Sequence, residues 1–233
     1  MNKILVWDLP LRMFHWMLAL LVTVSIVSAQ IGGNAMQIHL RSGYTILTLV
    51  LFRILWGFFG GTHARFAAFV RGPATAIAYL KELRRQTAGR HVGHNPTGGW
   101  SVMLMLAVLL IQAGTGLFSN DDISTEGPLA KLVSKAWSDR ISGIHEINVV
   151  VLYVLIGLHL AAVAFYFFFK RDNLVKPMLT GFKDAIAHGE AVQAHGEAMQ
   201  APDETAQTAG KTWLAATLLA ACAGCVYLLI MSV

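Results

Sequence analysis

The apolar run over residues 142–169 constrains the fold more than any other part of the chain. It is longer than the roughly 20 residues that a helix needs to cross a bilayer. Two histidines, His145 and His159, lie in it fourteen residues apart. In an α-helix this spacing returns the second side chain to within about 40° of the first and places it about 21 Å further along. One helix face therefore carries two imidazoles, one near each membrane surface, and ionisable groups inside a span usually mark function.

The composition predicts a polytopic membrane protein. Of the 233 residues, 55% are hydrophobic and only 13% are charged, which is unlike a soluble globular chain. We expect spans over about residues 11–31, 38–60, 100–118, 142–169 and 211–231, preceded by a short amphipathic segment over residues 1–10. The predicted fold class is an all-α membrane protein, in which residues 1–182 form a four-helix transmembrane bundle. Residues 183–210 are a polar linker, and residues 211–233 form one additional C-terminal transmembrane helix.

The charged loops predict the orientation. The polar loop over residues 61–99 holds six Lys or Arg and one Glu, whereas the loop over residues 119–141 holds three bases and four acids. Because basic loops stay in the cytoplasm, we expect a cytoplasmic amino terminus and a carboxyl terminus on the other side. The net charge of +5 follows this topology, so no nucleic-acid partner is predicted. Four tryptophans fall near the cytoplasmic ends and suggest an interfacial belt: Trp16, Trp56, Trp100 and Trp213.

This orientation sorts four histidines into two pairs. His15 and His159 fall near the cytoplasmic surface, and His39 and His145 fall near the periplasmic surface. Two imidazoles on one iron leave no open coordination position, which suits electron transfer rather than oxygen binding. The pattern therefore predicts two haems, with one imidazole pair for each. A proton-relaying transporter, whose histidines line a water-filled cavity, is the non-redox alternative.

Glycines and arginines near the four histidines support the haem interpretation. Gly143 and Gly157 each precede a histidine by two residues, and a glycine there lets a flat group approach the backbone. Arg53 follows His39 by fourteen residues on the same helix face, and a buried guanidinium suits a carboxylate such as a haem propionate. Arg41 could serve the other haem in the same way. Both arginines could instead be ordinary anchors at the membrane interface.

Several motifs resemble the bacterial cytochrome b561 family, the di-haem b-type membrane cytochromes grouped with the cytochrome b subunits of nickel hydrogenases. The resemblance covers about residues 5–182. Its motifs are VWDLPLRMFHW (6–16), IHLRSGY (38–44), RILWGFFG (53–60), HARF (63–66), GHNPTGGW (93–100) and MLTG (178–181), together with the two Gly-x-His units. The resemblance implies two haems b, with His15 and His159 as one ligand pair and His39 and His145 as the other.

The family resemblance also implies the function. We expect a protein of the bacterial inner membrane, embedded in lipid, that exchanges electrons between the quinone pool and a periplasmic donor or acceptor such as a c-type cytochrome. The alternative is a membrane-anchor cytochrome b subunit of a multi-subunit hydrogenase or dehydrogenase. No soluble domain is present that could carry a catalytic centre, so no catalytic residue is predicted.

Three further features are interpreted structurally. His63, His91 and His94 lie on the loop over residues 61–99 and are not expected to be iron ligands, although His94 could lie near a quinone headgroup. The linker contains AHGEA twice, and its composition favours a mobile or loosely helical tether over a metal site. Cys222 and Cys225 lack the following histidine of a c-type haem attachment, so packing is the expected role.

Overall fold

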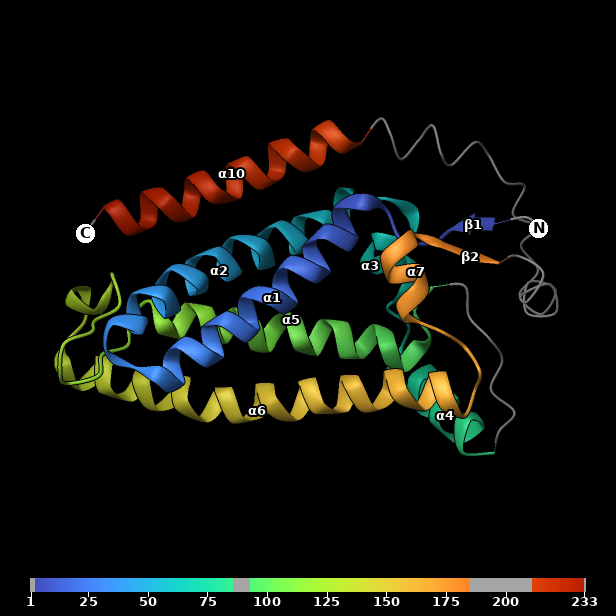
Figure 1. Cartoon of the computed structure of the whole chain (residues 1–233), viewed down its shortest axis with the longest axis horizontal. Helices are drawn as coiled ribbons and strands as arrows, with labels where there is room; N and C mark the ends of the chain where they lie inside the picture. Colours follow the sequence, from blue (N-terminus) through green and yellow to red (C-terminus); the bar gives the residue numbers. More distant parts are fainter. Residues whose placement is uncertain (1–2, 86–92, 185–210, 233) are drawn as a thin grey trace. The chain divides into compact units, whose positions relative to one another are not determined.

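The computed structural model describes residues 3–85, 93–184 and 211–232. Within these ranges, five helices are long and apolar enough to cross a membrane, and one of them is C-terminal. They are α1 (Leu9–Ile31), α2 (Met36–Phe59), α5 (Pro96–Gly116), α6 (Lys135–Phe168) and α10 (Thr212–Met231), and each is labelled in Figure 1. The predicted class of an all-helical, multi-pass membrane protein is therefore confirmed.

Two helices, α5 and α6, begin four or more residues earlier than their hydropathy predicts. α6 begins at Lys135 rather than near residue 142, because its first two turns are polar and lie outside the apolar run. α5 begins at Pro96 rather than near residue 100. The side chain of Asn95 accepts a hydrogen bond from the backbone N–H of Gly98 at 2.7 Å, which caps this helix, and a proline is well suited to the first helical position.

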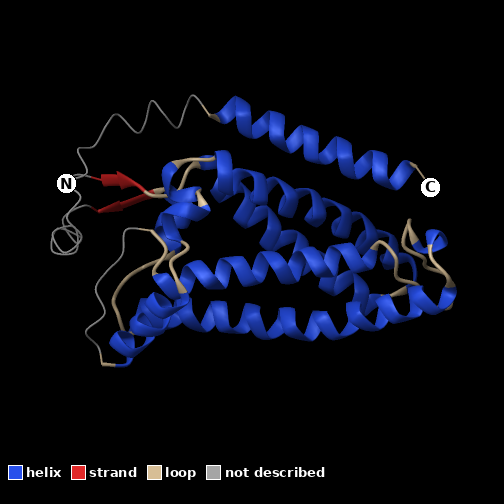
Figure 2. Ribbon diagram, turned by 180° about the vertical axis from the view of Figure 1, so that it is seen from behind, coloured by secondary structure: helices blue, strands red, loops and turns tan. Residues whose placement is uncertain are grey.

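One compact unit comprises the described parts of residues 1–12, 55–104 and 160–215. Strand β1 (Lys3–Leu5) pairs antiparallel with β2 (Phe182–Asp184) in a two-stranded sheet, drawn red in Figure 2. The predicted amphipathic segment is thus partly a strand. The predicted polar loop over residues 61–99 is also more ordered than expected. It contains the 3-10 turn η2 (Thr62–Ala64) and the helices α3 (Phe66–Phe69) and α4 (Pro73–Arg84), and α7 (Val175–Thr180) belongs to the same unit.

Asp8 organises the start of α1 in this unit. Its carboxylate accepts hydrogen bonds from the backbone N–H of Leu11 at 2.9 Å, from the indole of Trp56 at 3.1 Å and from the backbone N–H of Gly61 at 3.2 Å. Asp8 is 6% exposed and Trp56 is 1% exposed. The assignment of Trp56 to an interfacial belt is therefore wrong, because its ring is buried and its N–H is held by a carboxylate.

The second compact unit comprises residues 13–54, 105–159 and the described part of 216–233. It holds most of α1, α2, α5, α6 and α10, together with the short turns η1 (Gly33–Ala35) and η3 (Ala130–Leu132). Val226 of α10 is buried in one cluster with Leu47 of α2 and with Leu117 and Leu129. The additional C-terminal helix therefore packs against other segments of this unit.

The predicted three-part division of the chain stays a prediction. The linker over residues 183–210 lies almost wholly outside the described residues, and so do both of its AHGEA repeats. In α10, Cys222 is buried, Cys225 is exposed and both thiols are free.

Candidate functional site

The second unit brings His39 of α2 and His145 of α6 together. Their ring centroids are 6.3 Å apart. Metal–imidazole bonds are about 2 Å long, and the ring centre lies about 1 Å behind the nitrogen, so two imidazoles on opposite sides of one metal have centroids roughly 6 Å apart. The observed separation fits a metal held between the two rings.

The tautomer of His39 follows from its partners. Its Nδ1 atom lies 2.9 Å from the backbone oxygen of Ser25 and 3.0 Å from the Ser25 hydroxyl oxygen. A carbonyl oxygen can only accept, so Nδ1 carries the proton and donates it to Ser25. The Nε2 atom of His39 therefore keeps its lone pair and is available as a metal ligand.

His145 is held in the same tautomer by α5. The hydroxyl of Thr115 donates to the backbone oxygen of Ile111 at 2.7 Å, so its oxygen accepts from Nδ1 of His145 at 3.1 Å. The amide nitrogen of Gln112 lies 2.9 Å from Nε2 of His145. Asn148 donates to the amide oxygen of Gln112 at 2.7 Å, which fixes the direction of that amide. Nε2 of His145 therefore also bears a lone pair.

A cavity of about 320 Å³ lies beside this pair and is lined by both histidines. Gly43 and Gly116 are among its lining residues. A Cβ atom on Gly116 would lie 3.1 Å from Cε1 of His145, so a larger residue there would require that ring to shift slightly. Gly43 and Gly143 have nothing within 4 Å of a built Cβ. The open space at Gly143 is compatible with the flat group that the Gly-x-His unit predicts.

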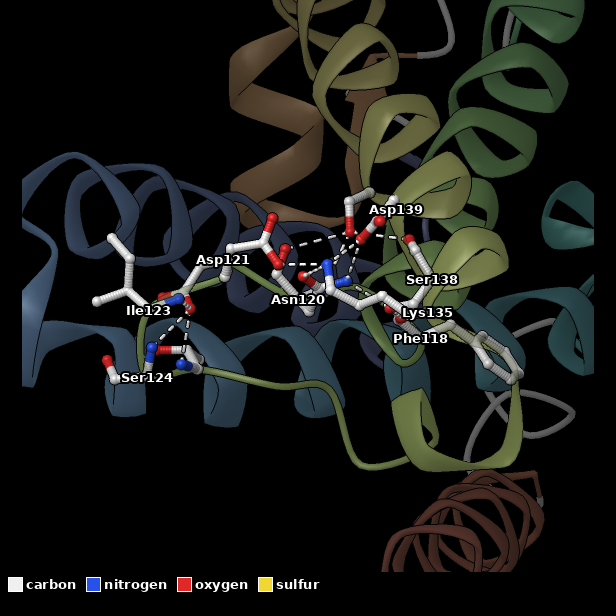
Figure 3. Close-up of polar contacts among 11 residues, drawn as sticks. Phe118, Asn120, Asp121, Ile123, Ser124, Lys135, Ser138 and Asp139 are labelled. Carbon is white, nitrogen blue, oxygen red and sulfur yellow. Dashed lines mark hydrogen bonds and ion pairs between the residues drawn. The ribbon is translucent and has the colours of Figure 1, made fainter.

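Polar contacts hold the loop between α5 and α6 (Figure 3), and two residues of this loop, Asn120 and Asp121, line the same cavity. Asn120, which lines the cavity, donates to the hydroxyl of Ser138 at 2.6 Å. Lys135 forms ion pairs with Asp122 and with Asp139, the latter at 2.5 Å. These contacts join the loop to the first turns of α6, the polar part of that helix which hydropathy did not predict.

Asp121 stabilises the turn of this loop. Its Oδ1 atom accepts backbone hydrogen bonds from Ile123 at 3.0 Å, Ser124 at 2.9 Å and Thr125 at 2.8 Å (Figure 3). Hydrogen bonds to the ionised carboxylate favour the charged form, and these three hold the pKa of Asp121 well below its usual range. Asp121 therefore places a fixed negative charge at the cavity lining.

His15 of α1 and His159 of α6 form the other pair in the second unit. Their centroids are also 6.3 Å apart, and the rings are inclined by 53°. The surroundings differ from those of the first pair. The Nδ1 atom of His15 is buried without a hydrogen-bond partner among the described residues, and no hydrogen bond from His159 to them is present. A Cβ atom on Gly157 would meet nothing within 4 Å.

The two candidate arginines differ in exposure. Arg53 of α2 is 1% exposed, whereas Arg41 is exposed near the start of the same helix. A buried cation in a membrane span is costly unless an anion compensates it.

Within the described ranges, no group of three or more His, Cys, Asp or Glu residues could hold a metal ion, so the two pairs are the candidate centres.

Four polar residues of the first site were not predicted. Ser25, Thr115, Gln112 and Asn148 all sit in apolar spans, and sequence reasoning treated them as ordinary span residues. A signal was present, because Gln112 precedes Thr115 by three residues and Asn148 follows His145 by three. Residues three apart share a helix face, and polar side chains inside a span usually face other protein groups.

His94 lies in an aromatic cluster of the first unit. Its ring contacts those of Trp7 and Phe69 in tilted arrangements, with centroids 4.6 Å and 4.5 Å away. Next to it, Asn95 donates to the hydroxyl of Tyr166 at 2.8 Å. The Tyr166 hydroxyl also bonds that of Tyr79 at 2.8 Å, and burial together with this bond raises the pKa of Tyr79. His91 lies outside the described residues.

Comparison with known proteins identifies the family. Residues 6–181 match the prokaryotic cytochrome b561 family. A probable Ni/Fe-hydrogenase B-type cytochrome subunit of Rhizobium leguminosarum bv. viciae is 27% identical over 220 residues, covering 78% of this chain and 91% of that protein. A protein of the same description from Azotobacter vinelandii is 25% identical over 225 residues, covering 78% and 89%. No solved structure matches the chain. The chain therefore belongs to the prokaryotic cytochrome b561 family, whose members are membrane electron carriers with b-type haem.

Proposed function

We propose that the protein holds two haems b and passes electrons between the quinone pool and a redox partner across the membrane. One haem is held by His39 and His145, and the other by His15 and His159. The observation that carries this proposal is the pair of ring separations, each 6.3 Å. When bound, each haem supplies one-electron iron chemistry, and two imidazole ligands leave no position for oxygen.

The chain's own residues prepare the first pair for iron. Ser25 and Thr115 hold the protons of His39 and His145 at Nδ1, so that both Nε2 atoms can ligate. The amide nitrogen of Gln112 lies 2.9 Å from Nε2 of His145, and Nε2 would give up this hydrogen bond in order to ligate iron.

Arg53 is the candidate partner for the propionates of the haem at His15 and His159. Its exposed fraction of 1% supports a buried ionic role over an interfacial anchor. Arg41 is exposed and is the weaker of the two candidates, at the haem of His39 and His145. Both assignments follow from guanidinium–carboxylate chemistry.

The proposed orientation places the amino terminus in the cytoplasm and the carboxyl terminus in the periplasm, within the bacterial inner membrane. The support is the excess of bases on residues 61–99, including the exposed Arg65, Arg71, Lys81, Arg84 and Arg85. The His39–His145 pair then faces the periplasm and a partner such as a c-type cytochrome. Fusion of a reporter enzyme to each terminus tests the orientation, and reporter activity at the carboxyl terminus in the cytoplasm would contradict it.

A second candidate function is a membrane anchor of a multi-subunit hydrogenase or dehydrogenase. It is supported by the names of the relatives, which are hydrogenase cytochrome subunits. Purification from the native membrane in a mild detergent separates the two. A stoichiometric hydrogenase or dehydrogenase subunit supports the anchor, whereas purification as a single haem-bearing chain supports a self-contained electron carrier.

A reduced-minus-oxidised absorption spectrum with a haem assay tests the main proposal. The expected result is a b-type α band and two haems for each chain. A protein that contains no haem would support the proton-relay alternative. One haem for each chain would show that one of the imidazole pairs is not a haem site.

A further inference from the structure

The two imidazole pairs have the same ring separation but different hydrogen bonds. Both rings of the His39–His145 pair donate from Nδ1, one to the backbone oxygen of Ser25 and one to the hydroxyl of Thr115. In the His15–His159 pair, Nδ1 of His15 is buried and has no partner within the described part of the chain. The difference therefore lies in the groups that contact the ligands.

A hydrogen bond donated from Nδ1 changes the basicity of the histidine ligand and therefore the redox potential of the bound metal. An imidazole that donates from Nδ1 is a more basic ligand at Nε2. A more electron-rich ligand stabilises ferric iron over ferrous iron, because the ferric ion carries the larger positive charge. The midpoint potential of the bound haem is lowered as a result.

We propose that Ser25 and Thr115 are positioning residues that make the haem at His39 and His145 the lower-potential haem of the two. This inference rests on the proposed function. With a haem at each pair, the one held by His39 and His145 would be the stronger one-electron donor, and the one held by His15 and His159 the stronger one-electron acceptor, with no proton exchanged. The chain would thereby favour electron flow from the first pair toward the second.

Most charges near the two pairs act in the same direction. The exception is Arg41, which is exposed, so its charge is better screened by solvent. Carboxylates of Asp121 and Glu146 belong to the lining of the cavity at His39 and His145, and negative charge favours the ferric form. Arg53 is buried on α2 and lies about 21 Å along that helix from His39, the same step that separates His145 from His159 on α6. Positive charge at that level favours the ferrous form of the second haem.

Thr115 is the residue at which this inference can be tested. Valine has nearly the shape of threonine but no hydroxyl, so Thr115→Val removes the acceptor of the His145 proton. Ser25 is less suitable, because its backbone oxygen remains after any substitution. Thr23→Val is the matched control, since Thr23 also bonds the carbonyl four residues earlier, at 2.9 Å, and is exposed. Thr115→Ser restores the hydroxyl and should restore the potential.

The measurement is an optical redox titration of the purified two-haem protein. Thr115→Val should raise the midpoint potential of one haem, whereas Thr23→Val and Thr115→Ser should leave both potentials at the wild-type values. An unchanged potential in Thr115→Val protein that retains both haems would overturn the inference. A wild-type protein without haem would instead refute the proposed function itself, so the two failures are distinguishable.

A second measurement applies even if Thr115→Val does not fold. His15→Ala should leave only the haem at His39 and His145, and His39→Ala should leave only the other. The haem retained by His15→Ala should titrate at the lower potential. The reverse order would overturn the inference without any use of Thr115.

Discussion

The His39–His145 pair and the His15–His159 pair share one dimension and differ in their surroundings. Ring centroids are 6.3 Å apart in both, yet within the described residues only the rings of the first pair have hydrogen-bond partners at Nδ1. Ser25, Thr115, Gln112 and Asn148 contribute hydroxyl, amide and carbonyl groups there. The comparison suggests that the register of the helices determines where the rings meet, while individual polar residues determine the hydrogen bonding, and so the redox potential, at each pair.

Removal of a ring is expected to have the largest effect on this comparison. His39→Ala or His145→Ala should remove one haem and leave the haem at His15 and His159. His15→Ala or His159→Ala should do the reverse, because each metal loses one of its two protein ligands. Haem content and the α-band spectrum of each purified variant provide the measurement.

Two results would contradict the pairing. Loss of the same haem in His39→Ala and His159→Ala would mean that the rings are matched incorrectly. Loss of either haem in the control His63→Ala, which changes a histidine outside both pairs, would mean that a ligand has been missed.

Substitution of Arg53 should change the midpoint potential of the haem at His15 and His159 more than that of the other haem. Arg53→Leu removes a buried positive charge and should lower the midpoint potential of the haem at His15 and His159, because that charge favours the ferrous form. The other haem should change less. Arg41→Leu is the control, since Arg41 is exposed and its charge is better screened. Equal shifts in the two variants would show that Arg53 has no special relation to that haem.

Asp8 tests the helix that carries His15. Asp8→Ala leaves the N–H groups of Leu11, Trp56 and Gly61 without their acceptor and should lower the free energy of unfolding by about 2 kcal/mol. On heating in detergent, the variant should release the haem at His15 before the haem at His39, since His15 lies about two turns into the same helix. The control is Asp139→Ala, which changes an exposed carboxylate and should lower the melting temperature much less. Equal melting temperatures for the two variants would refute the role of Asp8.

The smallest expected effect concerns the loop beside His39 and His145. The pKa of Asp121 is lowered in the folded protein by three backbone N–H groups. Its stabilisation is therefore present above the ordinary carboxyl pKa and is lost as the pH falls through the lowered value. At neutral pH, Asp121→Asn should speed hydrogen exchange at the amides of Ile123, Ser124 and Thr125, with no change at α1. Unchanged exchange there would show that the backbone alone maintains the turn.

The helices were predictable from the sequence because each apolar run is long enough to cross a bilayer as a helix. The fourteen-residue step between histidines predicted the depths at which their rings lie. The polar support of His145 was not predicted. Gln112 lies three residues before Thr115 on α5, so both can contact the same ring. The hydrogen bonds from Asn148 of α6 to α5 form only when the two helices pack together, and the sequence does not show that packing. The burial of Trp56 was missed for the same reason, because its partner Asp8 is distant in the sequence.

The small sheet carries a consequence for biosynthesis. The backbone of Lys3–Leu5 pairs with that of Phe182–Asp184, so the first of these strands is translated before α1, α2, α5 and α6, and its partner is translated after them. The ladder can therefore form only when all four helices have been translated. A chain that shows this pairing has been translated at least as far as Asp184, whereas α10 is made afterwards.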